Sequence, residues 1–166
     1  MNRPVTTLFM LMSVDGKIST GENDDLDFDK DFINITGVKE GLQQYYDIEQ
    51  TTDIWSLNSG RVQAKMGVNE ACDVSKTSVS FVIIDNHHLT LQGVHHFCNR
   101  AKNFVLVTSN KQHPAYNSDA KNLHIIYQEK LKLAAMLETL KKEYACNRIT
   151  IQTGNIKWFV FKRKTI

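Results

Sequence analysis

The chain has 166 residues, of which 42% are hydrophobic and only two are proline. This length supplies apolar side chains for one core, so we expect one domain over residues 1–166. The net charge is +2, but the last ten residues contain four basic side chains and no acid, and without them it would be −2. Proteins that read nucleic acid carry their basic residues as a patch on the folded surface. The charge therefore argues against a nucleic-acid partner.

No apolar run is long enough to span a membrane, and residues 1–7 lack the charged and apolar regions of a secretory signal. We expect a cytoplasmic protein with no membrane partner. The cysteines Cys72, Cys98 and Cys146 are odd in number and widely spaced. They indicate neither a disulfide framework nor a metal site, and we expect free thiols.

Short segments rich in Val, Ile, Leu and Phe alternate with helical patterns along the chain. We expect six strands, at Val5–Met12, Asp53–Leu57, Val79–Ile84, Phe104–Val107, Leu123–Tyr127 and Ile149–Ile151. Helices are expected over Val38–Glu49 and Leu131–Tyr144, the second with leucines and a methionine at helical spacing. This alternation is typical of an α/β fold with a mainly parallel sheet between layers of helices.

The first strand leads into the most informative stretch of the sequence. The apolar run Leu8–Met12 predicts a strand buried on both faces, and Ser13, Asp15 and Lys17 follow at its carboxyl end. Ligands of open α/β sheets bind at that end of the strands. The alternative is that Asp15 and the glycine after it form an ordinary turn.

A second candidate site follows the second strand, at Asn58, Ser59, Gly60 and Arg61. A small residue and a glycine let backbone N–H groups approach a phosphate closely, especially where a helix begins. Arg61 would add a charge-assisted contact. Asp85 and Ser109 follow two further strands and would line the same edge. The alternative is an ordinary surface loop.

Two other segments carry groups that bind metals elsewhere, but we expect no metal site in either. The acidic stretch Glu22–Asp31 lacks the glycine and the closing glutamate of an EF-hand, and we interpret it as a solvated loop. His87, His88, His95 and His96 lie within ten residues. If they stand in a strand, adjacent histidines point to opposite faces, and no cysteine or carboxylate completes a ligand set.

Four segments taken together resemble one family: Arg3–Ile18, Thr52–Val62, Val82–Asp85 and Ile149–Gly154. Their order and spacing, from about residue 3 to residue 154, resemble the reductase domain of bacterial riboflavin biosynthesis. This resemblance implies the three-layer fold of dihydrofolate reductase. It also implies an NADPH-dependent oxidoreductase that acts on 5-amino-6-(5-phosphoribosylamino)uracil and opens its ribose to a ribityl chain by hydride transfer.

The resemblance also assigns roles to single residues and implies a homodimer. Asp15 and Lys17 would be catalytic, and Ser13 and Gln152 would bind the substrate. The residues expected to bind NADPH are Asn58, Ser59, Gly60, Arg61, Asp85, Ser109, Thr153 and Gly154. The deaminase that often accompanies this reductase needs His-x-Glu and Pro-Cys-x-x-Cys to hold zinc. Neither motif occurs, so we do not expect deamination.

Three positions depart from the family. Gln152 stands where a glutamate is usual, and an amide cannot transfer a proton as a carboxylic acid does. Asn58 and Arg61 replace a usual glycine and a usual threonine, which bears on cofactor affinity and on the preference for NADPH. Two alternatives therefore stay open. One is that the chain is an inactive or weakened nucleotide-binding relative of the family. The other is that it reduces another pterin-like or pyrimidine compound.

The resemblance stops after Gly154, and residues 155–166 diverge from the family. A/T-rich codons for this segment, read in a shifted frame, would encode Gly-Glu-Ile-Leu-Asn-Gly-Leu-Phe-Leu-Lys-Glu-Lys-Leu, with leucines at helical spacing. We expect that this tail is a frameshift product and that the family's carboxyl-terminal strands are missing from the chain.

Overall fold

The computed structural model describes residues 2–12, 14, 35–72 and 74–153. Ser13, Asp15, Lys17 and Gly154 lie outside the described residues, as do the acidic stretch Glu22–Asp31 and the divergent tail. The chain divides into two compact units, one made of Met1–Thr7 with Asp53–Ile166 and the other of Leu8–Thr52. Each unit is described by itself.

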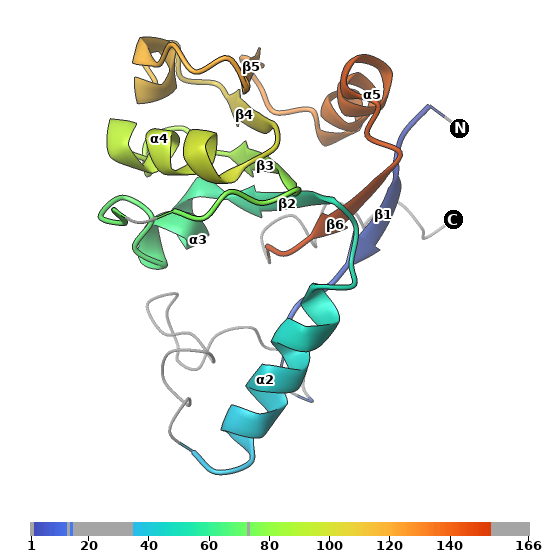
Figure 1. The fold of residues 1–166 in the computed structure, drawn as a ribbon. Coiled ribbons are helices and arrows are strands. Elements are labelled where there is room, and N and C mark those ends of the chain that lie inside the picture. Colours follow the sequence, from blue (N-terminus) through green and yellow to red (C-terminus); the bar gives the residue numbers. More distant parts are fainter. Residues whose placement is uncertain (1, 13, 15–34, 73, 154–166) are drawn as a thin grey trace. The chain divides into compact units, whose positions relative to one another are not determined.

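A six-stranded sheet forms the centre of the larger unit, and its strands run in the order β1-β6-β2-β3-β4-β5 (Figure 1). The strands are β1 (Val5–Leu8), β2 (Trp55–Ser59), β3 (Ser80–Ile84), β4 (Phe104–Thr108), β5 (Leu123–Tyr127) and β6 (Arg148–Ile151). The pairings β6–β2, β2–β3, β3–β4 and β4–β5 are all parallel. This confirms the predicted α/β fold with a mainly parallel sheet. Strand β6 comes last in the chain but lies beside β2, so strand order and chain order diverge there.

Helices cover both faces of this sheet. On one face α4 (Leu91–Arg100) and the short 3₁₀ helix η1 (Pro114–Asn117) enclose a buried apolar cluster, in which the rings of Phe97 and Phe104 lie 5.1 Å apart. Leu123 and Ile125 of β5 pack against this cluster. Side chains alternate along a strand, so His124 faces the other way, and there its ring contacts Tyr144 of α5 (Leu133–Tyr144). Two helical layers with the sheet between them make three layers.

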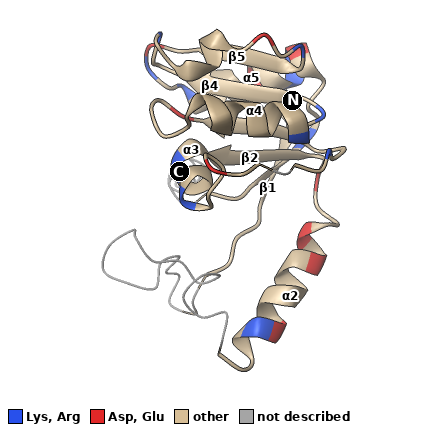
Figure 2. Cartoon of the chain, turned by 60° about the vertical axis from the view of Figure 1, so that its left-hand side comes forward, with Lys and Arg blue, Asp and Glu red and all other residues tan. Residues whose placement is uncertain are grey.

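The smaller unit contains α2 (Val38–Glu49), the helix predicted at the same residues. Its first turn is capped by Glu40, whose carboxylate accepts a hydrogen bond of 2.6 Å from the backbone N–H of Gly37. Tyr45 stacks on Phe9 at 4.7 Å between ring centres. Most of the helix is exposed, and its charged residues include Glu40, Asp47 and Glu49 (Figure 2).

The prediction for the first strand is wrong in length and burial. Strand β1 ends at Leu8 rather than Met12, and Val5 is 49% exposed. An edge strand has a neighbour on one side only, so it buries less surface than a central strand.

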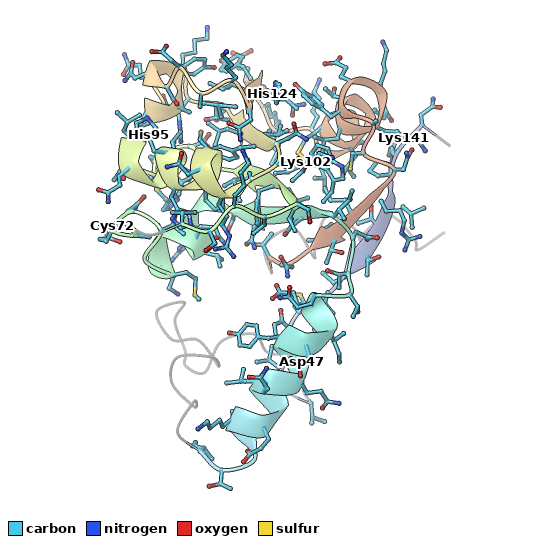
Figure 3. The ribbon with its side chains drawn as sticks, in the orientation of Figure 1. Asp47, Cys72, His95, Lys102, His124 and Lys141 are labelled. Atoms are coloured by element: carbon cyan, nitrogen blue, oxygen red, sulfur yellow. The ribbon has the colours of Figure 1, made fainter. Side chains whose placement is uncertain are left out.

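The sequence prediction also left out two helices. Helix α4 has apolar residues at Leu91, Val94, Phe97 and Cys98, a helical spacing that Gly93 and two histidines obscured. His95 therefore stands on a helix and not on a strand (Figure 3). Helix α3 (Gly60–Lys65) is only six residues long and begins directly after β2.

Candidate functional site

The carboxyl ends of β2 and β6 bring two of the predicted motifs together. Leu57 pairs with Ile151 in the ladder, and the backbone N–H of Gln152 donates to the carbonyl of Leu57 at 3.0 Å. One residue further on, the hydroxyl of Thr153 donates to Ser59 Oγ at 3.3 Å. The segment after β2 and the segment after β6 are nearly 100 residues apart in the chain and share one edge of the sheet. In α/β folds ligands bind at this edge, where the strand order reverses.

Ser59 is the centre of this edge. Its backbone is extended, and its Oγ accepts a hydrogen bond of 3.4 Å from the N–H of Val62, which makes it the N-cap of α3. The hydroxyl of Thr153 uses the second acceptor position. A serine hydroxyl has two acceptor positions and one donor hydrogen. Ser59 therefore presents its hydroxyl group, already tied to α3 and to Thr153, at this edge of the sheet.

Gly60 must be glycine because another side chain occupies its surroundings. A Cβ at this position would overlap the carboxyl group and the Cβ of Asp85. Gly60 is buried, and the turn between β2 and α3 rests directly on Asp85. Arg61 follows on the exposed side of α3. The structure thus brings Ser59, Gly60 and Asp85 together, as the sequence analysis expected for residues at one sheet edge.

The carboxylate of Asp85 is buried and saturated with hydrogen bonds. Its Oδ2 accepts from the backbone N–H of Leu89 at 2.9 Å and faces His113 Nε2 at 3.0 Å, and its Oδ1 faces His88 Nδ1 at 2.8 Å. The N–H of His88 also donates to this carboxylate. Burial alone would raise the pKa of Asp85, but these hydrogen bonds outweigh it and hold the pKa well below its ordinary value. Asp85 is therefore charged at neutral pH.

His113 completes this network, and nothing in the sequence indicated it. The ring is fully buried, and its Nδ1 accepts a hydrogen bond of 3.1 Å from the N–H of Ala115. A ring nitrogen that accepts carries no proton, so the proton lies on Nε2, which donates to Asp85. The neutral ring ties η1 to the end of β3. Asp85, predicted to contact the cofactor, has its carboxylate engaged within the protein, and its cofactor contact stays a prediction.

Asn86 joins the ends of β3 and β4. Its Oδ1 accepts hydrogen bonds from Thr108 Oγ1 at 3.1 Å, from the N–H of Ser109 at 2.8 Å and from Ser109 Oγ at 3.0 Å. Ser109 is exposed at the sheet edge, at the position that the sequence analysis expected. Its contact with a cofactor stays a prediction.

Gln152 is half-buried beside β2. Its Oε1 accepts a hydrogen bond of 2.6 Å from Ser56 Oγ, and this bond fixes the orientation of the amide. Asn58 is buried, and its Oδ1 accepts the N–H of Ser59 at 3.1 Å. Both side chains thus hydrogen-bond to residues of β2 and stabilise the backbone at this edge of the sheet. The predicted substrate residues Ser13, Asp15 and Lys17 lie outside the described residues.

The solved structures that share this fold include three enzymes. One is a diaminohydroxyphosphoribosylaminopyrimidine deaminase/5-amino-6-(5-phosphoribosylamino)uracil reductase from Thermotoga maritima, with a TM-score of 0.59 and 13% identity, covering 94% of this chain and 40% of that one. The riboflavin biosynthesis reductase Rib7 from Saccharomyces cerevisiae has a TM-score of 0.56 and 16% identity, covering 98% of this chain and 69% of that one. Acinetobacter baumannii RibD has a TM-score of 0.61 and 15% identity, covering 98% of this chain and 43% of that one.

No protein-family model matches the chain, and no curated protein matches it either. The chain spans about two-fifths of the length of the Thermotoga maritima and Acinetobacter baumannii proteins. Among the described residues, no helix is both long enough and apolar enough to cross a bilayer, and no group of three or more His, Cys, Asp or Glu side chains could hold a metal ion. At these identities the likeness shows the fold. The predicted fold class, an α/β fold like that of dihydrofolate reductase, is confirmed.

Proposed function

We propose that this protein is an NADPH-dependent reductase of a phosphoribosylamino-pyrimidine, of the kind used in riboflavin biosynthesis. The observation that carries the proposal is the meeting of Ser59, Gly60 and Thr153 at the edge where β6 lies beside β2. Two motifs of the family resemblance occupy this edge in a fold shared with riboflavin-pathway enzymes. Location in the cytoplasm and a homodimer remain predictions.

The groups at this edge fit the phosphates of such a cofactor. Ser59 offers its hydroxyl group at this edge, and Gly60 after it forms the tight turn from β2 into α3. The guanidinium of Arg61 pairs well with a phosphate group. The charge of Asp85 lies behind Gly60, but its oxygens are already hydrogen-bonded. When bound, the nicotinamide supplies the hydride.

On the substrate side, Gln152 can orient a bound molecule but cannot protonate it. Its amide both donates and accepts hydrogen bonds, and the bond from Ser56 Oγ holds it in one orientation. Proton transfer would fall to other groups. Asp15 and Lys17 remain our prediction for that role, with Ser13 as a hydrogen-bonding neighbour.

The test is a titration of the wild-type protein, Ser59→Ala and Arg61→Ala with NADPH. Loss of a hydrogen bond to a charged group costs roughly 1.5 to 3 kcal/mol, so we expect each variant to bind about 10- to 150-fold more weakly. The matched control is Lys102→Ala, which removes an exposed positive charge just before β4. Unchanged affinity in both site variants would show that the phosphates bind elsewhere.

Oxidation of NADPH in the presence of 5-amino-6-(5-phosphoribosylamino)uracil separates this proposal from its alternatives. We expect turnover in the wild-type protein, and in Lys17→Ala a loss of turnover with nearly unchanged NADPH affinity. The alternatives are an inactive nucleotide-binding relative and a reductase of another pterin-like or pyrimidine compound. The amide of Gln152 favours them, because it cannot transfer a proton as a carboxylic acid does. Binding of NADPH without its oxidation in the presence of this substrate would support these alternatives.

A further inference from the structure

His88 follows the carboxyl end of β3, beside the turn that follows β2. Ser59 and Ile84 are partners in the ladder of these two parallel strands, so the segments after them leave the sheet at the same level. Asp85 connects the two segments. A Cβ at Gly60 would overlap the carboxyl group of Asp85, with Oδ1 as its nearest oxygen, and the same Oδ1 faces His88 Nδ1 at 2.8 Å. One carboxylate oxygen thus lies against both Gly60 and the ring of His88.

The hydrogen bond to Asp85 fixes which ring nitrogen of His88 is used within the protein. The carboxylate of Asp85 is charged and can only accept, so Nδ1 of His88 donates to it. Nε2 has no hydrogen-bond partner among the residues that the structure describes, and 34% of the side chain is exposed. Nε2 is therefore the nitrogen that remains for a ligand. It accepts a hydrogen bond in the neutral ring, whereas in the protonated ring it donates one and the ring is positively charged.

The charge of Asp85 opposes an anion at the turn after β2. Its side chain is fully buried behind Gly60, and the hydrogen bonds that it accepts weaken the field of its charge but do not remove it. The titratable groups that face the ring of His88 are Asp85 and His87, whose ring stacks on it at 4.3 Å between centres. His113 faces the other oxygen of Asp85, and its ring is neutral. A proton on His88 would therefore offset the charge of Asp85 at this edge.

We propose that His88 binds a phosphate group of the nucleotide at this edge and takes up a proton as the nucleotide binds. The inference rests on the proposed function and adds to it a ligand-binding residue that makes affinity depend on pH. Histidine ordinarily changes its charge between pH 5 and 8. A bound phosphate stabilises the protonated ring, so by linkage the protonated ring binds phosphate more tightly by the same factor. Arg61, exposed on α3, stays charged throughout this range and adds affinity at every pH.

Calorimetric titration with NADP⁺ at about pH 6 and about pH 8 tests the proposal in the wild-type protein, His88→Gln and His95→Gln. NADP⁺ carries the same phosphates as NADPH and is stable at the lower pH. A hydrogen bond between two charged groups at a partly exposed site supports a change of about tenfold, so the wild-type protein should bind about tenfold more tightly at the lower pH. His88→Gln keeps a donor for Asp85 and should lose most of this pH dependence. The matched control His95→Gln removes an exposed histidine of α4 and should behave like wild type.

The ring of His88 can also be followed directly by NMR through its Cε1–H signal, which is assigned by its loss in His88→Gln. We expect bound NADP⁺ to raise the midpoint of its titration by about one pH unit, because tenfold tighter binding of the protonated form corresponds to one unit. An unchanged midpoint would overturn this inference alone, and so would a pH dependence of affinity that His88→Gln retains. If NADP⁺ binds at neither pH, the proposed function fails and this inference fails with it.

Discussion

Asp85 is a buried carboxylate that stays charged because donors surround it. The N–H groups of His88 and Leu89 and the ring of His113 all face its two oxygens. An isolated buried charge would protonate instead, since desolvation disfavours the charged form. The network connects β3, the turn after it and η1, and Gly60 packs against it. We therefore expect the charge of Asp85 to contribute to folding as well as to the shape of the site.

The substitution Asp85→Asn tests this contribution. The amide would turn an NH₂ group toward donors, so the variant should lose about 3 kcal/mol of unfolding free energy at neutral pH. The pKa of Asp85 is lower in the folded protein than its ordinary 3.8, so the stabilisation is present above that value and is lost as the pH falls below it. Urea unfolding should show a constant gap between wild type and variant above about pH 5, and a narrowing gap below about pH 4.

The exposed Asp119→Asn serves as the control, because it removes an acid without touching the network. It should change the unfolding free energy by less than about 0.5 kcal/mol at every pH. If Asp85→Asn behaves like Asp119→Asn, the network adds nothing to stability.

At the scale of elements, two helical glycines differ in what surrounds them. Gly41 of α2 has no heavy atom near the position of an added Cβ, whereas at Gly93 of α4 that Cβ would overlap Asn69 Oδ1. This oxygen accepts hydrogen bonds from the N–H of Thr90 at 2.9 Å and from Thr90 Oγ1 at 3.2 Å. Asn69 thereby anchors the start of α4 to the segment that follows α3. A close approach explains Gly93, and nothing in the structure explains Gly41.

Alanine at these two positions should act in opposite directions. Gly41→Ala should stabilise its helix by about 0.5 to 1 kcal/mol, because alanine loses less backbone entropy than glycine on folding. Gly93→Ala should destabilise the protein by about 1 to 2 kcal/mol, because it displaces Asn69 from its hydrogen bonds. Urea unfolding followed by circular dichroism measures both. In an Asn69→Ala background the cost of Gly93→Ala should disappear, and an equal cost in both backgrounds would exclude the clash.

At the scale of the whole molecule, the reactivity of the three cysteine thiols measures how accessible the interior is to solvent. They are free, as predicted: Cys72 is exposed, and Cys98 and Cys146 are buried. Burial raises the pKa of Cys98, and burial together with the charge of Asp53 raises the pKa of Cys146 to about 12. The thiolate is the reactive form. Both buried thiols are therefore inert until the structure opens.

Alkylation followed by mass spectrometry should find one modified thiol in the native protein and three after unfolding in urea. The variant Cys72→Ser should stay unmodified under native conditions, which assigns the native label. Modification of Cys98 should follow the unfolding transition of the larger unit, because its thiol stands on the buried face of α4 and belongs to the apolar cluster. Rapid labelling of Cys98 in the native state would mean that α4 opens without global unfolding.

The sequence by itself determined the elements whose signals are local. Helix α2 and strand β5 have the predicted bounds, and the remaining strands shift by one or two residues except β1. Alternation of apolar strands with helices was enough for a mainly parallel sheet, because parallel strands require crossover connections. The sequence also predicted that Ser59 and Gly60 stand at the carboxyl end of the second strand, and there the structure has them. Their contact with a cofactor stays a prediction.

Only the tertiary structure decided what surrounds that edge. The Asp85–His113 hydrogen bond joins residues 28 positions apart, and the contact of Ser59 with Thr153 joins residues 94 positions apart. No local pattern records such pairs, because they depend on which strands become neighbours. Gly93 is a further example. A side chain there would overlap Asn69, which lies in another segment of the chain. Strand order also places β6, the last strand in the chain, between β1 and β2, which no local pattern records.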